Sequence, residues 1–151
     1  MKYLLMSDEY VAQVAALEKD SFSMPWSETA IRKELTNPLS LWLVAVDEEV
    51  LVGYVGSQSV MGEADMMNIA VSQTYRRRGV AKKLIDELIS RLSAQNVYSL
   101  TLEVRASNES AISLYSALGF VQVGRRPNYY TAPKEDALIL RKEWNNENTG
   151  N

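Results

Sequence analysis

Apolar and polar residues follow two different periods along this chain. Helical spacing and capping residues predict helices over 9–20, 27–35, 79–94 and 109–118. Apolar alternation and short apolar runs predict strands over 2–6, 41–46, 50–60, 64–71, 98–104, 120–123 and 136–141. The resulting order, β-α-α-β-β-β-α-β-α-β-β, is typical of an α/β or α+β domain with a mixed sheet.

The chain is predicted to fold as one domain. Its length of 151 residues suits a single domain, and all the predicted helices and strands fall within residues 1–144. Residues 145–151 are polar and are predicted to form a disordered tail.

A basic block lies at the start of the helix predicted over 79–94. It holds five of the 16 Lys and Arg residues and no acid: Arg76, Arg77, Arg78, Lys82 and Lys83. Because a helix N-terminus is already electropositive, these cations repel one another unless an anion binds there. Phosphate or pyrophosphate is the anion that such a site suits best. A solvated basic turn before an ordinary amphipathic helix would carry the same residues.

The composition limits the chemistry that this chain can perform. The formal net charge is -3 despite the basic block, so the block is a local feature, which argues against nucleic acid as the main ligand. The chain has no Cys and no His, which excludes disulfides, thiolate metal sites, a Cys nucleophile and a His base. We expect no metal site, and we expect any proton transfer to use carboxylates, Tyr, Lys or water.

The N-terminal residues show no signal-peptide pattern, because Asp8 and Glu9 closely follow a short apolar run. No stretch of the sequence is long and apolar enough to predict a membrane span. The lack of Cys also fits a reducing compartment. We therefore expect a soluble, cytoplasmic protein with no membrane partner.

Three motifs follow the segment 68–71, which reads Asn-Ile-Ala-Val. The segment 76–81 reads Arg-Arg-Arg-Gly-Val-Ala, 102–108 reads Leu-Glu-Val-Arg-Ala-Ser-Asn, and 111–120 reads Ala-Ile-Ser-Leu-Tyr-Ser-Ala-Leu-Gly-Phe. With these motifs in this order, most of the chain resembles the GNAT superfamily of acyl-CoA N-acyltransferases. The resemblance implies a GNAT fold, in which a single mixed central β-sheet is flanked by helices on both faces.

Four segments are closer still to one GNAT subfamily. The segments 25–27, 68–71, 102–108 and 128–130 resemble the bacterial ribosomal-protein-alanine N-acetyltransferases of the RimI type. This resemblance implies acetyl-CoA as the donor and the N-terminal alanine of small-subunit ribosomal protein 18 as the acceptor. The subfamily usually has Pro after its Tyr-Tyr pair, whereas Thr131 follows here, so this chain departs from the subfamily in the acceptor loop.

The resemblance also implies a set of residues that bind acetyl-CoA. Gly79 has no Cβ and lets the backbone approach the pyrophosphate, and Asn108 bonds the cofactor as well as capping its helix. Backbone amides at 69–71 hold the acetyl carbonyl and the pantetheine arm. The full set is Ile69, Ala70, Val71, Arg77, Arg78, Gly79, Val80, Ala81, Lys82 and Asn108. Capping alone would explain Asn108, and core packing would explain the side chains at 69–71.

Glu103 and Tyr115 are the catalytic residues that the resemblance implies. Glu103 would be the general base, a task that is easier for an α-amine of pKa about 8 than for a lysine of pKa about 10.4. Tyr115 would protonate the departing CoA thiolate. From the pattern alone, Glu103 fits a solvent face and Tyr115 fits a core-facing position beside Leu118. Without a Cys to carry the acyl group, direct attack in a ternary complex is the simplest mechanism.

Trp26, Tyr129 and Tyr130 are predicted to line the acceptor groove, although clustered aromatics fit a hydrophobic edge equally well. Three other functions remain open. A GNAT enzyme could instead acetylate a lysine side chain, a polyamine or another small amine. A non-catalytic acyl-CoA-binding module would need neither Glu103 nor Tyr115. Binding of RNA or of the ribosome through the basic block would depend steeply on salt.

Overall fold

The computed structural model describes residues 1–144, and the tail predicted over 145–151 lies outside them. The strands are β1 (Lys2–Leu5), β2 (Ser40–Asp47), β3 (Val50–Val60), β4 (Glu63–Val71), β5 (Ser99–Arg105), β6 (Val121–Thr131) and β7 (Lys134–Glu143). The helices are α1 (Val11–Ser21), α2 (Glu28–Glu34), α3 (Val80–Ala94) and α4 (Glu109–Ala117), with short 3-10 helices at Asp8–Tyr10 and Gln73–Tyr75. This order confirms the order predicted from the sequence.

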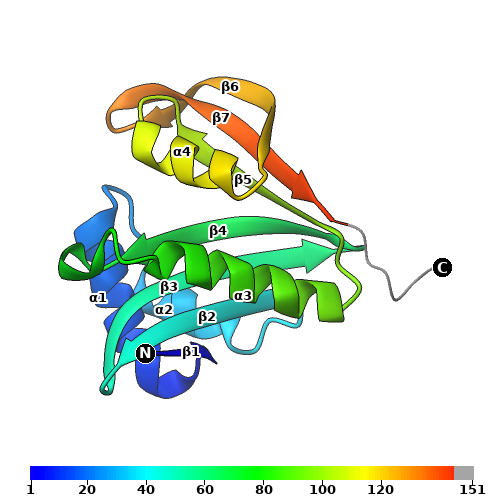
Figure 1. Cartoon of the computed structure of the whole chain (residues 1–151). Helices are drawn as coiled ribbons and strands as arrows, with labels where there is room; N and C mark the ends of the chain where they lie inside the picture. The colour runs from blue at the N-terminus through cyan, green and yellow to red at the C-terminus, as the bar shows by residue number, and fades with distance from the viewer. Residues whose placement is uncertain (145–151) are drawn as a thin grey trace.

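The strands form one mixed, seven-stranded sheet in the order β1-β2-β3-β4-β5-β7-β6. β4 and β5 are parallel, and they pair only where Glu63–Asp65 lie beside Ser99–Thr101. Beyond these residues the two strands diverge (Figure 1). The second half of β4 is therefore paired with β3 on one side and is left open on the side of β5.

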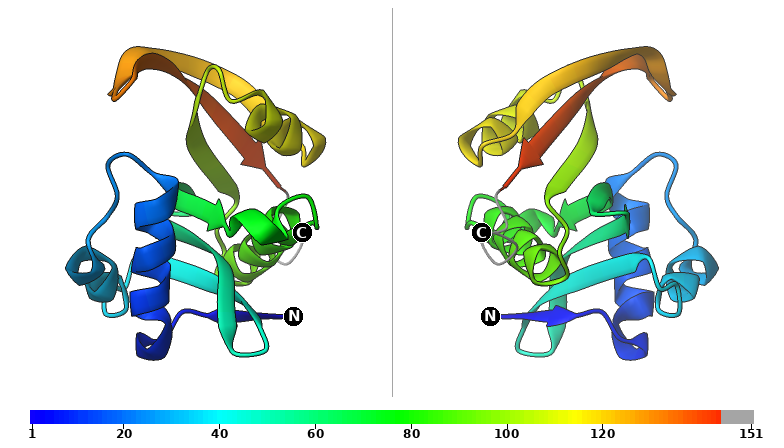
Figure 2. Two further views of the ribbon diagram at one scale, coloured as in Figure 1. Left: turned by 90° about the vertical axis from the view of Figure 1, so that its left-hand side faces the viewer. Right: turned by 90° about the vertical axis from the view of Figure 1, so that its right-hand side faces the viewer.

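Helices cover both faces of the sheet (Figure 2). α3 and α4 pack on one face, where Leu84, Leu88 and Tyr115 join one core cluster. α1 and α2 pack on the other face, where Val11 and Ile31 are fully buried. The mixed sheet with helices on both faces, which the GNAT resemblance implies, is thereby confirmed. Within residues 1–144, no helix combines the length and the apolarity needed to cross a bilayer.

The last two strands are longer than the sequence predicts. The predicted strands at 120–123 and 136–141 instead extend until they meet at a tight turn, residues 132–133. β6 is an edge strand, which is where a sheet tolerates a residue such as Pro127 that lacks an N–H. Its register against β7 also shifts near Asn128, whose φ is 56°. These irregularities remove the apolar alternation by which a strand is recognised.

Candidate active site

A cavity of about 790 Å³ lies where β4 and β5 diverge. Its walls come from both faces of the sheet, because α4 lines one side and the α1–α2 loop lines the other. The end of β6 completes the walls. The predicted site residues that line this first cavity are Trp26, Ile69, Glu103, Asn108, Tyr115, Tyr129 and Tyr130. Elements from both faces of the sheet therefore meet around this cavity.

A second cavity, of about 500 Å³, adjoins the first at Ala111, which lines both. Its other walls are the end of β4, the basic turn, the first turn of α3 and the part of α4 that holds Ser110 and Leu114. The predicted site residues that line it are Val71, Arg77, Gly79, Val80, Ala81 and Lys82. The two cavities are therefore neighbours between the start of α3 and Glu103.

The start of α3 has the features of an anion site. Gly79 is the N-cap with a φ of 81°, and Arg77 also has a positive φ, of 64°. Lys83 N donates to Gly79 O at 3.0 Å, so the amides of 80–82 precede the first bond within the helix and have no helical partner. No acid lies in the first turn, and Arg77 makes no ion pair within residues 1–144. Unpaired amides beside a cation suit a phosphate group.

Three other cations of the basic block, Arg76, Arg78 and Lys82, have neighbours in the protein. The Arg78 guanidinium lies 4.8 Å from the centre of the Tyr75 ring and lines neither cavity, so its role in cofactor binding stays a prediction. Lys82 lines the second cavity and its Nζ lies 3.1 Å from Asp86 Oδ2. Arg76 was not in the predicted set, and it lines this cavity too.

The end of β4 presents backbone amides to the open side of the strand. Ser72 N donates to Val52 O of β3 at 2.8 Å. Because the amides of successive residues in a strand point to opposite sides, this bond shows which amides of β4 face β3. The amide of Ala70 therefore faces β3, whereas those of Ile69 and Val71 face the side left open by β5. The amide role predicted for all three residues fits Ile69 and Val71, and the side chain of Ala70 packs into the core beside α1.

Glu103 lies on β5 with its side chain in the first cavity. The side chain is 29% exposed, and its Oε2 lies 2.6 Å from Nε of Arg126 on β6. Burial and then the charge of Glu103 raise the pKa of Asp65, on the neighbouring strand β4. The same two causes raise the pKa of Tyr129. Glu103 is therefore a partly buried carboxylate with a cation and a second acid nearby, rather than a solvated surface charge.

Tyr115 belongs both to the core and to the first cavity. It is 6% exposed, and its ring meets Phe120 edge-on with the ring centres 5.6 Å apart. In the described part of the chain, its hydroxyl has no hydrogen-bond partner and is not among the fully buried polar atoms. Burial and then the nearby Tyr130 raise the pKa of Tyr115 to about 12. A phenol of this pKa keeps its proton at neutral pH and is a weaker acid than an ordinary tyrosine.

Asn108 is the N-cap of α4. Its side-chain oxygen accepts a hydrogen bond from Ala111 N at 3.2 Å, as a helix cap requires. The residue also lines the first cavity, so a cap and a contact with a bound ligand are compatible in one side chain.

Three aromatic residues line the first cavity opposite α4. Trp26 lies in the α1–α2 loop, edge-on to Trp42 with the ring centres 5.5 Å apart. Tyr129 and Tyr130 lie at the end of β6, with their ring centres 5.1 Å apart. The structure thus brings together residues from distant parts of the sequence, and their role in acceptor binding stays a prediction that this position permits.

Glu18 on α1 was not predicted from the sequence. It is fully buried, and its carboxylate accepts hydrogen bonds from Trp26 N at 2.9 Å and from Asn68 Nδ2 at 2.7 Å. It also accepts a hydrogen bond from the hydroxyl of Tyr54. These contacts fix the α1–α2 loop to β4 beside the cavity. The sequence could have indicated it, because a charged residue at position 18 shares the buried face of α1 with Val14.

Comparison with known proteins places these features in a family context. Residues 11–120 match the acetyltransferase (GNAT) family. A [ribosomal protein bS18]-alanine N-acetyltransferase from Salmonella typhimurium is 39% identical over 127 residues, which cover 82% of this chain and 84% of that protein. The crystal structure of the ribosomal-protein-S18-alanine N-acetyltransferase from Escherichia coli superposes with a TM-score of 0.87 at 31% identity, covering 99% of each chain.

A longer relative also matches most of this chain. An uncharacterized protein of Mycobacterium leprae is 37% identical over 139 residues, which cover 88% of this chain. The chain spans only 38% of the length of that protein.

Proposed function

This chain belongs to the acetyltransferase (GNAT) family, and on that premise we propose that it moves acetyl from acetyl-CoA to the N-terminal alanine amine of ribosomal protein bS18. The names of the Salmonella typhimurium and Escherichia coli relatives state this acceptor. The observation that carries the proposal is the pair of adjoining cavities. One lies at an unpaired helix N-terminus, and the other is lined by Glu103 and Tyr115 and by elements from both faces of the sheet.

The donor lies along the two cavities. Its pyrophosphate binds the unpaired amides of 80–82, with Arg77 as an additional cation. A Cβ added at Gly79 would meet no atom within 4 Å, so this position borders open space that the pyrophosphate can fill. The pantetheine arm follows the open side of β4, where the amides of Ile69 and Val71 donate to it and to the acetyl carbonyl.

The reaction needs a neutral amine, because an ammonium has no lone pair with which to attack. Glu103 takes a proton from the N-terminal ammonium, directly or through a water, and the amine attacks the thioester carbon. The amides of Ile69 and Val71 stabilise the charge that develops on the carbonyl oxygen. As the C–N bond forms and the C–S bond breaks, Tyr115 gives its proton to the leaving thiolate. The nitrogen then loses a second proton, which reprotonates Tyr115 through solvent, and Glu103 releases its own proton to solvent.

The acceptor displaces Arg126 from Glu103. The Arg126 side chain is 58% exposed, and its guanidinium lies 5.5 Å from the centre of the Tyr129 ring. An ion pair as exposed as this one contributes little stability. An ammonium that enters the cavity carries the same charge, so it can replace the guanidinium without leaving Glu103 unpaired.

Tyr115→Phe is expected to lower kcat about a hundredfold, the size of effect that loss of a general acid produces. The affinity for acetyl-CoA should stay the same, because Phe keeps the ring contact with Phe120.

Because the pKa of Tyr115 is raised to about 12, its proton is not lost as pH rises through the usual tyrosine pKa. The kcat of the unmodified protein should therefore show no fall at about pH 10 from this group. Steady-state kinetics measures both the kcat of Tyr115→Phe and the pH dependence of kcat in the unmodified protein. An unchanged kcat in the variant would mean that Tyr115 only packs in the core.

The proposed function is tested by incubating the protein with acetyl-CoA and a peptide that begins Ala-Arg. Fragmentation in the mass spectrometer then locates the acetyl group. Acetyl on the α-nitrogen supports the proposal. A peptide that stays unmodified, while the protein binds acetyl-CoA, contradicts it.

A further inference from the structure

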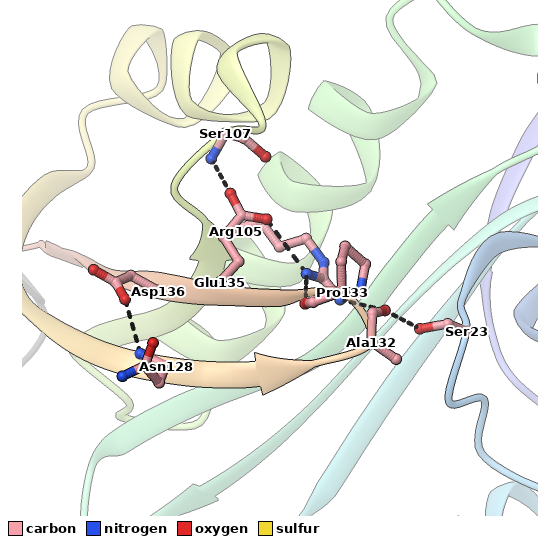
Figure 3. A network of polar contacts seen from close by, with 8 residues as sticks. All are labelled: Ser23, Arg105, Ser107, Asn128, Ala132, Pro133, Glu135 and Asp136. Atoms are coloured by element: carbon pink, nitrogen blue, oxygen red, sulfur yellow. Dashed lines mark hydrogen bonds and ion pairs between the residues drawn. The ribbon is translucent and has the colours of Figure 1, made fainter.

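The turn between β6 and β7 contacts the α1–α2 loop across the first cavity. Ser23 Oγ donates to Ala132 O at 3.0 Å, and Thr131 Oγ1 lies 3.9 Å from Sδ of Met24. Figure 3 shows Ser23 meeting this turn from the α1–α2 loop. The aromatic pair that lines the cavity directly precedes the turn, so we call residues 129–134 the roof of the cavity.

Arg105, the last residue of β5, has a partly exposed side chain that contacts the roof. Its guanidinium donates to Pro133 O at 2.9 Å and to Ala132 O at 3.1 Å (Figure 3). The same guanidinium lies 4.2 Å from the centre of the Tyr130 ring. One side chain therefore contacts both the turn and the aromatic pair.

Glu135 connects Arg105 to the start of α4. Its Oε1 lies 3.3 Å from Nη1 of Arg105, and its Oε2 accepts a hydrogen bond from Ser107 N at 2.6 Å. The bond from Ser107, with a smaller contribution from Arg105, lowers the pKa of the Glu135 carboxyl, which is therefore charged at neutral pH. Ser107 directly precedes Asn108, the N-cap of α4 that lines the first cavity.

We propose that Arg105 and Glu135 are positioning residues, which hold the roof over the acceptor and align it with the donor held beside α4. The inference rests on the proposed function, because it assigns the first cavity to an acceptor. The planar guanidinium suits this task. It bonds two carbonyls and a carboxylate while it stacks on a ring, which the compact ammonium of a lysine cannot do from one position.

The roof also bears on the reacting groups. Tyr130 lies close enough to Tyr115 to contribute to its raised pKa. Burial and then the charge of Glu103 raise the pKa of Tyr130 itself. A roof that shifts therefore moves Tyr130 relative to both catalytic candidates and changes how an acceptor is seated between them.

Arg105→Lys tests the inference, because it keeps the charge and removes the fork of the guanidinium. We expect the KM for an Ala-Arg peptide to rise about tenfold as charge-assisted hydrogen bonds are lost, with the Kd for acetyl-CoA unchanged within about twofold. Arg125→Lys is the matched control. It makes the same change on β6, where Arg125 Nε lies 2.7 Å from Asp136 Oδ2 and lines neither cavity. The control should leave the KM unchanged.

Hydrogen exchange in the free protein gives a second readout that needs no acceptor. Arg105→Lys should speed exchange of the roof amides, whereas Arg125→Lys should not, because only the first loosens the turn. Glu135→Gln keeps an oxygen for Ser107 and loses the charge that pairs with Arg105. It should give a smaller change in the same direction, and it replaces Arg105→Lys if that variant does not fold.

Equal effects of Arg105→Lys and Arg125→Lys on the KM and on roof exchange would overturn the inference. A Kd for acetyl-CoA that rises as much as the KM would also overturn it, because the damage would then be general. Absence of transfer by the unmodified protein would instead overturn the proposed function. In that case roof exchange would still decide whether Arg105 and Glu135 hold the roof.

Discussion

Glu103→Gln is expected to lower kcat/KM for an N-terminal alanine peptide by about a hundredfold or more, as the loss of a general base does. The Gln side chain has nearly the same shape as Glu, and its oxygen can keep the contact with Arg126, but it does not accept a proton at neutral pH. The affinity for acetyl-CoA is expected to stay the same, because Glu103 does not line the cavity at the start of α3.

The pH dependence distinguishes a base from a residue that merely binds the acceptor. Above about pH 8 an α-amine loses its proton without help, so the difference between Glu103→Gln and the unmodified protein should narrow. Glu63→Gln is the matched control, because Glu63 lies at the start of β4, pairs with Arg141 at 3.1 Å and lines neither cavity. If Glu103→Gln leaves turnover unchanged, Glu103 is not the base.

Gly79→Trp is expected to weaken acetyl-CoA binding by about a hundredfold or more, which corresponds to about 2.8 kcal/mol. Gly79 has a φ of 81°, a conformation that costs any other L-residue strain. A Cβ there meets no atom within 4 Å, so the indole occupies the open space beside the amides of 80–82 rather than clashing with the core. Isothermal titration calorimetry with acetyl-CoA measures the loss directly.

Two alanine variants separate the effect of backbone strain from the effect of a side chain that occupies the anion site. Gly79→Ala and Gly119→Ala both place a Cβ at a positive φ, and Gly119 lines neither cavity. Both should lower the temperature of unfolding, and only the variant at Gly79 should weaken acetyl-CoA binding. A folded Gly79→Trp protein with unaltered affinity would contradict the anion site at the start of α3.

The helices and inner strands could be predicted because each carries its own local signal. Ser27 and Asn108 accept hydrogen bonds from the amides three residues ahead, as the sequence suggests for helix caps. The bounds of β3 agree with the prediction, because apolar residues dominate its first half and a turn that contains Gly62 ends it. β6 could not be predicted to its full length. Its interior contains Pro127 and Asn128, and its conformation comes from pairing with β7 rather than from its own pattern.

The candidate site also has a part that the sequence could predict and a part that it could not. The runs 76–81 and 102–108 are continuous in the sequence, so their motifs could be recognised without a structure. The contacts around the first cavity join distant residues, with Glu18 and Asn68 50 positions apart and Arg105 and Glu135 30 positions apart. Such pairs follow from the order of strands in the sheet, and no local pattern marks them.

CoA release from acetyl-CoA shows whether the acceptor is an N-terminal amine or a lysine side chain. One peptide begins Ala-Arg with a free α-amine. The other has the same sequence with its α-amine blocked and an internal lysine added. We predict release with the first peptide and none with the second. Release with the blocked, lysine-containing peptide, and none with the free N-terminus, would contradict the proposed acceptor and identify a side-chain acetyltransferase.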